Sequence, residues 1–584
     1  MTNLLQKLEL NWLGKDKRPR LEPRILLEDM ALSHHARFCR TENDIYDNKL
    51  IYGDNLLALK ALEQEYTGRV KCVYIDPPFN TQQAFEHYDD GIEHSLWLSL
   101  IRDRLEIIHR LMTTDGTLFI HIDDNELAYL TVLTDEIFGR KNRINIVTFK
   151  QGSTTGHKAI NPGLVSTSNF ILIYAKDKVN WKPNRVFTTR VERDKRYSQF
   201  IENISAPCSE WRFCSLMRAF SAAKGIPEKT LKKNLGKNFE TEITAFVHEN
   251  ANAVIRLARP EYDAVSAAAR EMIDQSKTLR GQVMILERPG LSDMYFVGGE
   301  RIIFYANKLK MIDGQYVDGE PLTNIWDDIL SNNLHNEGGV EFPKGKKPES
   351  LIKRCIELST APGDIVLDSF AGSGTTGAVA HKMRRRWIMI ELREQARTHI
   401  QPRLQQVIDG DDQGGISKAV GWTGGGGFRY YQLAPSLLIE DAHGFSVINP
   451  EYNPVMLAEA MCKLMGFRYE PSDTFYWQHG QSNENAYIYI TTRLLDRAAL
   501  ALISADVGPD RSLVICCPGW RGKADQFDNL VLHKIPKAVL SRCEWGHDDY
   551  SLNIKNLPLL KPEPESEQPA KAAPKAADMP LFGE

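Results

Sequence analysis

The chain has 584 residues, of which 25% are charged and 42% are hydrophobic, and its formal net charge is −4. This composition is ordinary for a soluble globular protein and excludes a wholly disordered chain. A single core rarely grows beyond about 250–300 residues, so we expect several domains. The near-neutral charge argues against a general DNA coat but leaves room for a local basic cleft.

No apolar run approaches the roughly 20 residues that a membrane helix needs. The polar N-terminus lacks the apolar segment of a secretory signal. The nine cysteines are scattered and form no Cys-x-x-Cys pair. We therefore expect a cytoplasmic protein with reduced thiols, without a disulfide framework, a metal site or a membrane partner.

After a polar lead-in over residues 1–48, strands and helices alternate. We expect three strands, at 49–53, 70–75 and 116–122, and two helices, at 55–62 and 97–112. The continuous apolar run at 70–75 is typical of a strand that is buried on both faces. This alternation predicts a parallel α/β sheet, whose first part spans residues 49–149.

The pattern changes over residues 150–322. A strand is still predicted at 168–175 and a helix at 264–273, but the remaining sequence is mixed. A local basic cluster is formed by Lys224, Lys229, Lys232, Lys233 and Lys237. Taken alone, this lysine cluster is typical of a solvated helix face.

The α/β pattern returns over residues 323–415. Helices are predicted at 350–359 and 374–382, and strands at 365–367 and 387–390. Four consecutive glycines at 424–427 predict a linker. Beyond it, residues 433–560 predict a separate small α/β domain with strands near 486–491 and 512–516. The segment 561–584 is rich in Pro, Ala, Lys and Glu, and we expect it to be disordered.

A glycine-rich loop joins the strand at 365–367 to the following helix. Gly372, Gly374 and Gly377 have the GxGxxG spacing, in which glycines permit a tight turn and the close approach of a ligand. Glu391 follows the next strand, where a carboxylate can accept the ribose hydroxyls of an adenosine-containing cofactor. The loop alone leaves NAD and S-adenosylmethionine open, and no Gly-Lys-Ser/Thr sequence indicates ATP use.

The tetrapeptide Asp76-Pro77-Pro78-Phe79 follows the strand at 70–75, at the sheet edge where open α/β sheets place chemistry. These residues suit methylation of an exocyclic amine, whose lone pair is delocalised into its ring. Asp76 and the carbonyl of Pro77 can accept the two N–H hydrogen bonds, and Phe79 can stack on the base. Such catalysis works mostly by positioning. The base must be extruded from the duplex at a cost of a few kcal/mol.

These motifs resemble those of the amino-methylating DNA methyltransferases, most closely the modification (Mod) subunits of type III restriction-modification systems. The resemblance covers about residues 49–392. It implies a permuted Rossmann-like S-adenosylmethionine-dependent sheet of the β class. A target-recognition domain at 150–322 is then inserted between a catalytic half (49–149) and a cofactor half (323–415). The resemblance implies cofactor contacts by Asp54, Phe342, Lys347, Pro348, Asp368, Phe370, Gly372, Gly374, Thr375 and Glu391.

Further expectations depend on this resemblance. Asp76 at the first position of the tetrapeptide is similar to adenine-N6 enzymes, and Phe79 in place of the commoner Tyr should preserve stacking. The strand at 49–53 would be the third strand of the sheet and would place Asp54 near the cofactor adenine. The segment 121–126 resembles a family segment beside the target pocket. The lysine cluster becomes a candidate contact for DNA phosphates.

The implied partners are double-stranded DNA, a second copy in a homodimer, and a separate restriction (nuclease-helicase) subunit. The motif Asp578-Met579-Pro580-Leu581-Phe582 is similar to peptides that bind the sliding clamp, although a chance apolar end is the simpler interpretation. Three alternatives to adenine methylation stay open. They are N4-cytosine methylation by the same geometry, an NAD-dependent oxidoreductase, and an inactive DNA-binding specificity subunit.

Overall fold

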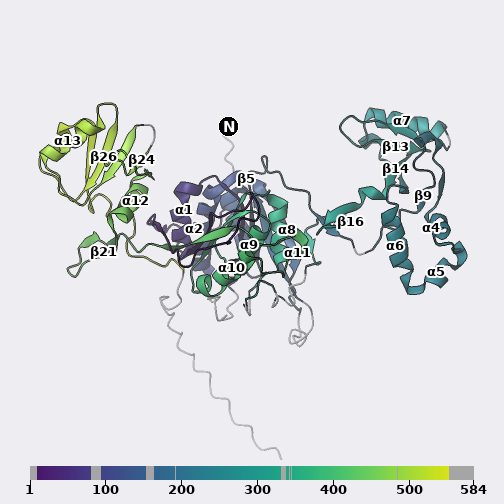
Figure 1. The fold of residues 1–584 in the computed structure, drawn as a ribbon, viewed down its shortest axis with the longest axis horizontal. Helices are drawn as coiled ribbons and strands as arrows, with labels where there is room; N and C mark the ends of the chain where they lie inside the picture. The colour runs from purple at the N-terminus through teal and green to yellow at the C-terminus, as the bar shows by residue number, and fades with distance from the viewer. Residues whose placement is uncertain are drawn as a thin grey trace, which may run out of the picture.

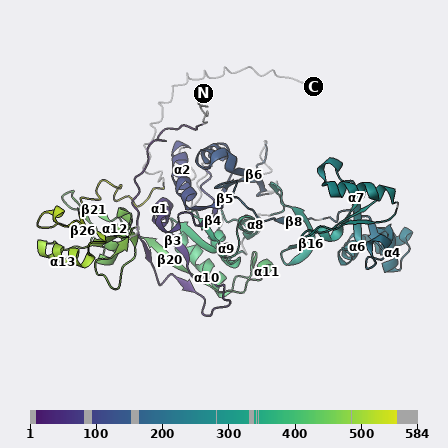
Figure 2. The ribbon, with the colours of Figure 1, turned by 90° about the horizontal axis from the view of Figure 1, so that it is seen from above.

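The computed structural model describes residues 9–80, 94–152, 164–190, 192–279, 281–329, 334, 337–340, 342, 345–482 and 485–551. A central body carries one lobe on each of two opposite sides, and both views agree on this arrangement (Figure 1, Figure 2). The predicted disordered tail and its motif at 578–582 lie outside the described residues.

In the described part of the chain, the central body holds an 11-stranded sheet. Ten of its strands follow one another across the sheet in the order β1-β20-β3-β19-β18-β4-β5-β7-β6-β17, and β2 pairs with β20. Their bounds, in chain order, are β1 Leu26–Glu28, β2 His34–His35, β3 Asn48–Tyr52, β4 Val70–Ile75, β5 Met112–Ile122, β6 Arg143–Lys150, β7 Ser168–Ala175, β17 Ile325–Trp326, β18 Ile365–Asp368, β19 Arg386–Glu391 and β20 Gly427–Leu433.

The sheet is mixed rather than wholly parallel. Its centre is parallel, as the alternating pattern predicts, but β7 runs antiparallel to both β5 and β6. At the other edge, β1 and β2 run antiparallel to β20. Counted outward from β18 through β19, β3 is the third strand, which confirms the position expected for it.

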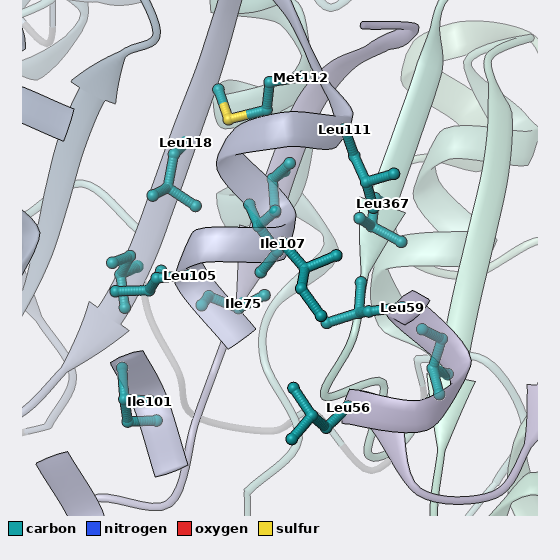
Figure 3. Packing of buried hydrophobic residues seen from close by; sticks show 14 of the residues in the cluster. Leu56, Leu59, Ile75, Ile101, Leu105, Ile107, Leu111, Met112, Leu118 and Leu367 are labelled. Carbon is teal, nitrogen blue, oxygen red and sulfur yellow. The ribbon is translucent and has the colours of Figure 1, made fainter. Parts of the chain in front are cut away.

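Helices cover both faces of the sheet. The strand residues alternate between two hydrophobic clusters, so that Val73 and Ile75 face one and Cys72 and Tyr74 face the other. The first cluster packs under α1 (Asn55–Tyr66), α2 (His94–Leu111) and α3 (Leu127–Thr134), as Figure 3 shows for α1 and α2. The second packs under α8 (Glu349–Ser359), α9 (Thr375–Lys382) and α10 (Gln401–Asp409), and the short α11 spans Ser417–Val420. This burial on both faces explains the continuous apolar runs of the central strands.

Two expected boundaries are corrected by the sheet. The boundary at residue 150 falls inside it, because β7 lies between β5 and β6. The lead-in over 1–48 contributes β1 and β2 to the same sheet. In both cases the pairing partner is distant in sequence, so no local pattern indicates it.

The glycine run at 424–427 does not act as a linker. Its backbone is packed against the central body: the N–H of Gly425 donates to the carbonyl of Ile408 at 2.8 Å, and that of Gly427 to Ile45 at 2.8 Å. A Cβ at Gly426 would lie 2.6 Å from the carbonyl oxygen of Ile45. Glycine is needed here because the chain enters β20 in close contact with other backbone.

One lobe is formed by the chain between β7 and β17. Its base is a three-stranded sheet of β8 (Phe187–Thr189), β15 (Leu309–Ile312) and β16 (Gln315–Pro321). Beyond it lies a six-stranded antiparallel sheet in the order β10-β9-β11-β14-β13-β12. Its strands are β9 Gln199–Ile201, β10 Phe213–Ser215, β11 Val254–Ala258, β12 Met284–Leu286, β13 Met294–Val297 and β14 Glu300–Phe304. The lobe also contains four helices, α4 Leu216–Lys224, α5 Leu231–Leu235, α6 Phe239–Glu249 and α7 Ala267–Thr278. Of these, α4 and α7 pack on the six-stranded sheet, and α5 packs against α6.

The other lobe follows β20 and is a small α/β unit, as predicted. The strands β25 (Ala486–Ile490), β26 (Ser512–Cys517) and β27 (Leu530–Lys534) are parallel, and β23 (Arg468–Tyr469) and β24 (Gly480–Gln481) extend the sheet. It contains α12 (Pro454–Met465), α13 (Arg497–Val507) and a hairpin of β21 (Leu438–Glu440) and β22 (Ser446–Ile448). All nine cysteines are free thiols. A bilayer-spanning helix is not found among the described residues.

Candidate active site

The two sequence motifs meet at one edge of the sheet. β4 and β18 are neighbouring parallel strands, with Val73 opposite Leu367. The tetrapeptide follows the last residue of β4, and the glycine-rich loop follows the last residue of β18. Carboxyl ends of adjacent parallel strands lie about 4.8 Å apart, so the fold brings two distant segments into one site.

The tetrapeptide is held from its inner side. The indole Nε1 of Trp97, a fully buried residue of α2, donates to the carbonyl of Pro78 at 2.8 Å. Phe79 packs against the first hydrophobic cluster, and its ring centroid lies 5.7 Å from that of His121. Asn80 has a φ of 57°, a left-handed conformation that asparagine tolerates better than most residues. The loop therefore leaves the strand with a defined backbone path.

A buried hydrogen-bond chain lies behind Phe79. The Tyr74 hydroxyl is 3.0 Å from His121 Nδ1, and the Asn169 amide is 3.1 Å from His121 Nε2. Burial, with the nearby charge of Lys347, lowers the pKa of His121 well below its usual range. The imidazole is therefore neutral near neutral pH and adds no positive charge beside the tetrapeptide.

The end of the tetrapeptide loop is tied to the segment at 121–126. The Asn80 amide donates to Glu126 Oε1 at 2.8 Å, and His94 Nδ1 lies 2.8 Å from the same oxygen. Glu126 is buried. Sequence reasoning identified this segment only through the resemblance and gave it no role; its structural role is to link the loop to the start of α2.

Lys347 contacts the tetrapeptide. Its Nζ is 2.9 Å from Asp76 Oδ2 and 4.9 Å from the ring centroid of Phe79. The side chains of Lys347 and Asp76 are 10% and 20% exposed. The resemblance implies a cofactor contact for Lys347, which stays a prediction; in the structure its ammonium group lies against the tetrapeptide.

The glycine-rich loop has the backbone that the spacing predicts. Gly372 and Gly374 have φ values of +53° and +76°, which disfavour residues with a Cβ. A Cβ at Gly374 would also lie 2.8 Å from the Ile400 side chain. Gly377 packs directly on Met389 of β19. The loop therefore depends on glycine both for its turn and for its packing.

The buried carboxylates of Glu391 and Asp368 accept hydrogen bonds from this loop. Glu391 Oε2 accepts from the N–H of Gly372 at 2.8 Å. Asp368 accepts from the N–H of Phe370 at 2.9 Å and from the Thr376 hydroxyl at 2.6 Å. Burial raises the pKa of both Glu391 and Asp368 to about 7, and the charges of Asp76 and Glu391 contribute to the shift of Asp368.

A buried ion network supports the other side of the loop. Arg403 donates to the Thr375 hydroxyl at 2.8 Å and to Glu349 Oε1 at 2.9 Å. Lys382 is 2.9 Å from Glu349 Oε2 and 2.7 Å from Asp412 Oδ2. These charged side chains are at most 3% exposed. Sequence reasoning missed the network because its members come from separate segments without a common motif.

The remaining predicted cofactor residues have structural contacts. Asp54 caps α1, with Oδ1 accepting from the N–H groups of Leu56 and Leu57 at 2.9 and 3.0 Å. Its Oδ2 accepts from the N–H of Tyr550 at 3.0 Å. These contacts give the carboxylate a structural role, and its contact with the cofactor adenine stays a prediction. Pro348 is the N-cap residue of α8, and the Phe342 ring packs edge-on against His399.

The lysine cluster lies on the surface of the lobe that contains α4–α6, and all five side chains are exposed. Two of them make internal contacts. Lys224 pairs with Glu242, and Lys232 Nζ lies 5.5 Å from the ring centroid of Phe239. Within the described ranges, no group of three or more His, Cys, Asp or Glu residues could hold a metal ion.

A family model described as DNA methylase matches residues 70–402, a span that includes both motifs. The chain belongs to the DNA methylase family. Among curated relatives, this methylase is 34% identical over 411 residues to a protein of Haemophilus influenzae Rd named as a probable type III restriction-modification enzyme HindVI Mod subunit. The match covers 67% of the chain and 54% of that relative, so the methylase spans about half of the relative's length. The resemblance to Mod subunits that the motifs indicate is thereby confirmed.

A second relative, the DNA adenine methyltransferase YhdJ of Escherichia coli K12, is 34% identical over 343 residues, which cover 59% of the methylase and 78% of YhdJ. Among solved structures, a DNA modification methylase of Thermus thermophilus complexed with S-adenosyl-L-methionine matches with a TM-score of 0.30 and 14% identity. This match covers 66% of the methylase and 97% of that chain.

Proposed function

We propose that the methylase is a site-specific DNA adenine-N6 methyltransferase that uses S-adenosylmethionine and acts as the modification subunit of a restriction-modification system. The observation that carries the proposal is the tetrapeptide beside the glycine-rich loop, at the ends of β4 and β18. The names of the HindVI and YhdJ relatives support the reaction and the target base. Family membership argues against an oxidoreductase.

The strand order supports a permuted sheet of the β class. The strand with the catalytic motif precedes the strand with the cofactor loop in the chain, although the two are neighbours in space. The lobe between β7 and β17 separates the two halves and is the candidate target-recognition domain. Its exposed lysine cluster then becomes a candidate contact for DNA phosphates, which set position without specifying sequence.

The residues around the glycine-rich loop fit an adenosine-containing cofactor. Gly372 and Gly374 leave room for close approach, and the carboxylate of Glu391 is held at the loop by the N–H of Gly372. Each carboxylate oxygen has a second lone pair, so Glu391 can still accept ribose hydroxyls. When bound, S-adenosylmethionine would supply a methyl group on a positively charged sulfur.

The tetrapeptide would activate the amine. Asp76 accepts one amine N–H and the carbonyl of Pro77 accepts the other, which localises the nitrogen lone pair. Phe79 stacks on the extruded base, and the neutral His121 supports the ring without adding charge. Holding both reactants in one orientation lowers the entropic part of the barrier.

For partners, we propose double-stranded DNA, a second copy of the chain, and a restriction subunit. The name of the HindVI relative, a Mod subunit of a restriction-modification enzyme, supports DNA and a restriction subunit as partners. Pairing with a second copy rests on the resemblance alone. N4-cytosine methylation uses the same geometry and is an outcome of the test. Binding of the sliding clamp by residues 578–582 stays a prediction.

Modification-sensitive sequencing of DNA from cells that express this chain alone tests the proposal. We expect N6-methyladenine at one short recognition sequence and none in cells that carry an Asp76→Ala variant. N4-methylcytosine instead would change the assigned base, and unmodified DNA would contradict the proposal for the chain acting alone.

Cofactor affinity should increase with pH. Burial raises the pKa of Glu391 to about 7, so the carboxyl group becomes ionised only as the pH rises through that value. The ionised form is the better hydrogen-bond acceptor for ribose hydroxyls. We expect the cofactor Kd to fall by about tenfold between about pH 6 and about pH 8. Titration calorimetry measures it, and Glu391→Gln should flatten the profile.

The effect on folding has the opposite sign. The raised pKa values mean that the fold favours the neutral forms of Glu391 and Asp368. Their contribution to the free energy of unfolding is therefore complete below the ordinary carboxyl pKa values and is lost as the pH rises through about 7.

For the cofactor-affinity prediction, a wild-type Kd that does not change with pH would contradict the assigned role of Glu391.

Trp97→Phe should lower kcat by about tenfold, because the Pro78 carbonyl would lose its buried donor, an effect of roughly 1–3 kcal/mol. We expect the cofactor KM to change little, since Trp97 holds the tetrapeptide and not the glycine-rich loop. Trp12→Phe is the matched control, because it also removes an indole donor: Trp12 donates to the Ser99 hydroxyl at 2.8 Å, and Ser99 lies on α2, the helix that carries Trp97. Equal kcat values in the two variants would contradict the positioning role.

A further inference from the structure

The ammonium group of Lys347 makes two contacts that the target base would need. It lies 2.9 Å from Asp76 Oδ2, where the amine of the base would donate, and 4.9 Å from the centroid of the Phe79 ring, on which the base would stack. Stacked rings keep their centroids about 4.5–7 Å apart. The ammonium group and a stacked base therefore compete for the same layer of space.

Charge also opposes the presence of Lys347 in the reacting complex. A cofactor held at the neighbouring glycine-rich loop, with its methyl group on a cationic sulfur, would bring a like charge toward the same carboxylate. The nitrogen that accepts the methyl group also becomes positive as its new bond forms. Like charges at such short distances repel strongly where water is largely excluded.

The backbone around Lys347 is anchored, so the side chain is the part that can move. On one side, the side-chain Nζ of Lys346 donates to the carbonyl of Val340 at 3.1 Å. On the other side, the carbonyl of Pro348 accepts from the N–H groups of Leu351 and Ile352 at 3.1 and 3.4 Å. Pro348 is also the N-cap residue of α8. Between these two fixed points, the four-carbon stem of Lys347 can carry its ammonium group away from Asp76 without a change of fold.

We propose that Lys347 is a positioning residue that competes with the target base for Asp76 and Phe79, and that a cationic cofactor group displaces it. Capture of the extruded base is then coupled to the presence of the cofactor. This inference rests on the proposed function, because it takes a DNA base and S-adenosylmethionine as the two reactants. It adds to that function a residue whose side chain occupies the base pocket until the cofactor is bound.

The wild-type protein provides the first test. A duplex with the recognition sequence, containing 2-aminopurine at the target adenine, fluoresces more strongly when that base is extruded. We expect sinefungin, which carries an ammonium group in place of the sulfonium, to promote extrusion about tenfold more than S-adenosylhomocysteine, which is neutral at sulfur. Equal enhancement by the two compounds, each at saturating concentration, would overturn the proposal.

The second test removes the lysine charge. Lys347→Met should bring base extrusion without any cofactor to the level that the wild-type protein reaches only with sinefungin. Lys347→Arg keeps the charge and should retain the dependence. Lys353→Met is the matched control, since it deletes a 2.8 Å ion pair with Glu357 on the adjacent helix α8. A Lys347→Met protein that still requires sinefungin would refute the competition.

These outcomes are separable from those of the proposed function. If the wild-type protein leaves DNA unmodified in the sequencing experiment, the function fails before Lys347 is tested. If the wild-type protein methylates DNA while Lys347→Met, with an unchanged thermal unfolding midpoint, behaves as the wild type, only the inference fails. Should Lys347→Met not fold, the comparison of the two cofactor analogues on the wild-type protein decides.

Discussion

Replacement of Asp76 by alanine should lower the rate of methyl transfer by at least about 10³-fold, because the amine would lose the carboxylate that orients it and localises its lone pair. Cofactor binding should largely survive, since the glycine-rich loop and Glu391 are held by contacts that do not involve Asp76. A radioactive methyl-transfer assay measures the rate, and calorimetry measures the cofactor Kd.

Asp115→Ala is the matched control for this variant. Asp115 lies in β5, at the end of β4 that is opposite to the tetrapeptide, and like Asp76 it is paired with a lysine, here Lys71 of β4. Its loss removes an ion pair of similar type from the sheet without touching the site. We expect a rate within about twofold of the wild type, as is usual for surface substitutions. Comparable rates for Asp76→Ala and Asp115→Ala would refute the assignment of Asp76.

Glu349→Gln should lower the free energy of unfolding by about 3–5 kcal/mol, the usual cost of removing one partner from a buried ion pair. Glu349 is fully buried and contacts both Lys382 and Arg403, so the variant leaves two buried cations with Asp412 as their remaining acid in the network. Urea unfolding measures the change. Cofactor affinity should also fall, because Arg403 connects Glu349 to Thr375 of the glycine-rich loop.

Asp328→Asn provides the comparison. Asp328 forms a 2.6 Å ion pair with Arg354 on α8, the helix that begins with Glu349, but its side chain is 43% exposed. Water screens such a pair, and we expect a cost of about 0–1 kcal/mol. A similar small cost for Glu349→Gln would show that the buried network does not support the loop.

Local sequence was sufficient to predict the elements that contain the motifs. The strand at 70–75 and the strand at 168–175 have the predicted bounds, because continuous apolar runs report burial on both faces. Helix α1 extends beyond the predicted 55–62, to Tyr66. Its last turn is polar, so apolar periodicity could not indicate it. The helix predicted at 264–273 lies slightly later, at Ala267–Thr278, where Ser266 caps it.

The pairing of strands that are distant in the chain could not be predicted from local sequence. The residues 168–175 predict a strand but do not specify its partners, so the sequence places it in the inserted domain, whereas it lies between β5 and β6 in the central sheet. Local composition likewise predicts a linker at 424–427. The glycines are required there by the nearby backbone of Ile408 and by that of Ile45, which is about 380 residues away in the chain.

The sequence by itself determined the two motifs on which the proposed chemistry rests, because the tetrapeptide and the glycine-rich loop are each a continuous segment whose residue types limit what it can do. Tertiary structure alone decided the partners of those residues. In the folded chain, Lys347 pairs with Asp76, and Asp54 caps α1. Arg403 donates to Thr375 of the glycine-rich loop. Charged side chains act through whatever lies within a few ångströms, and only folding brings such distant residues together.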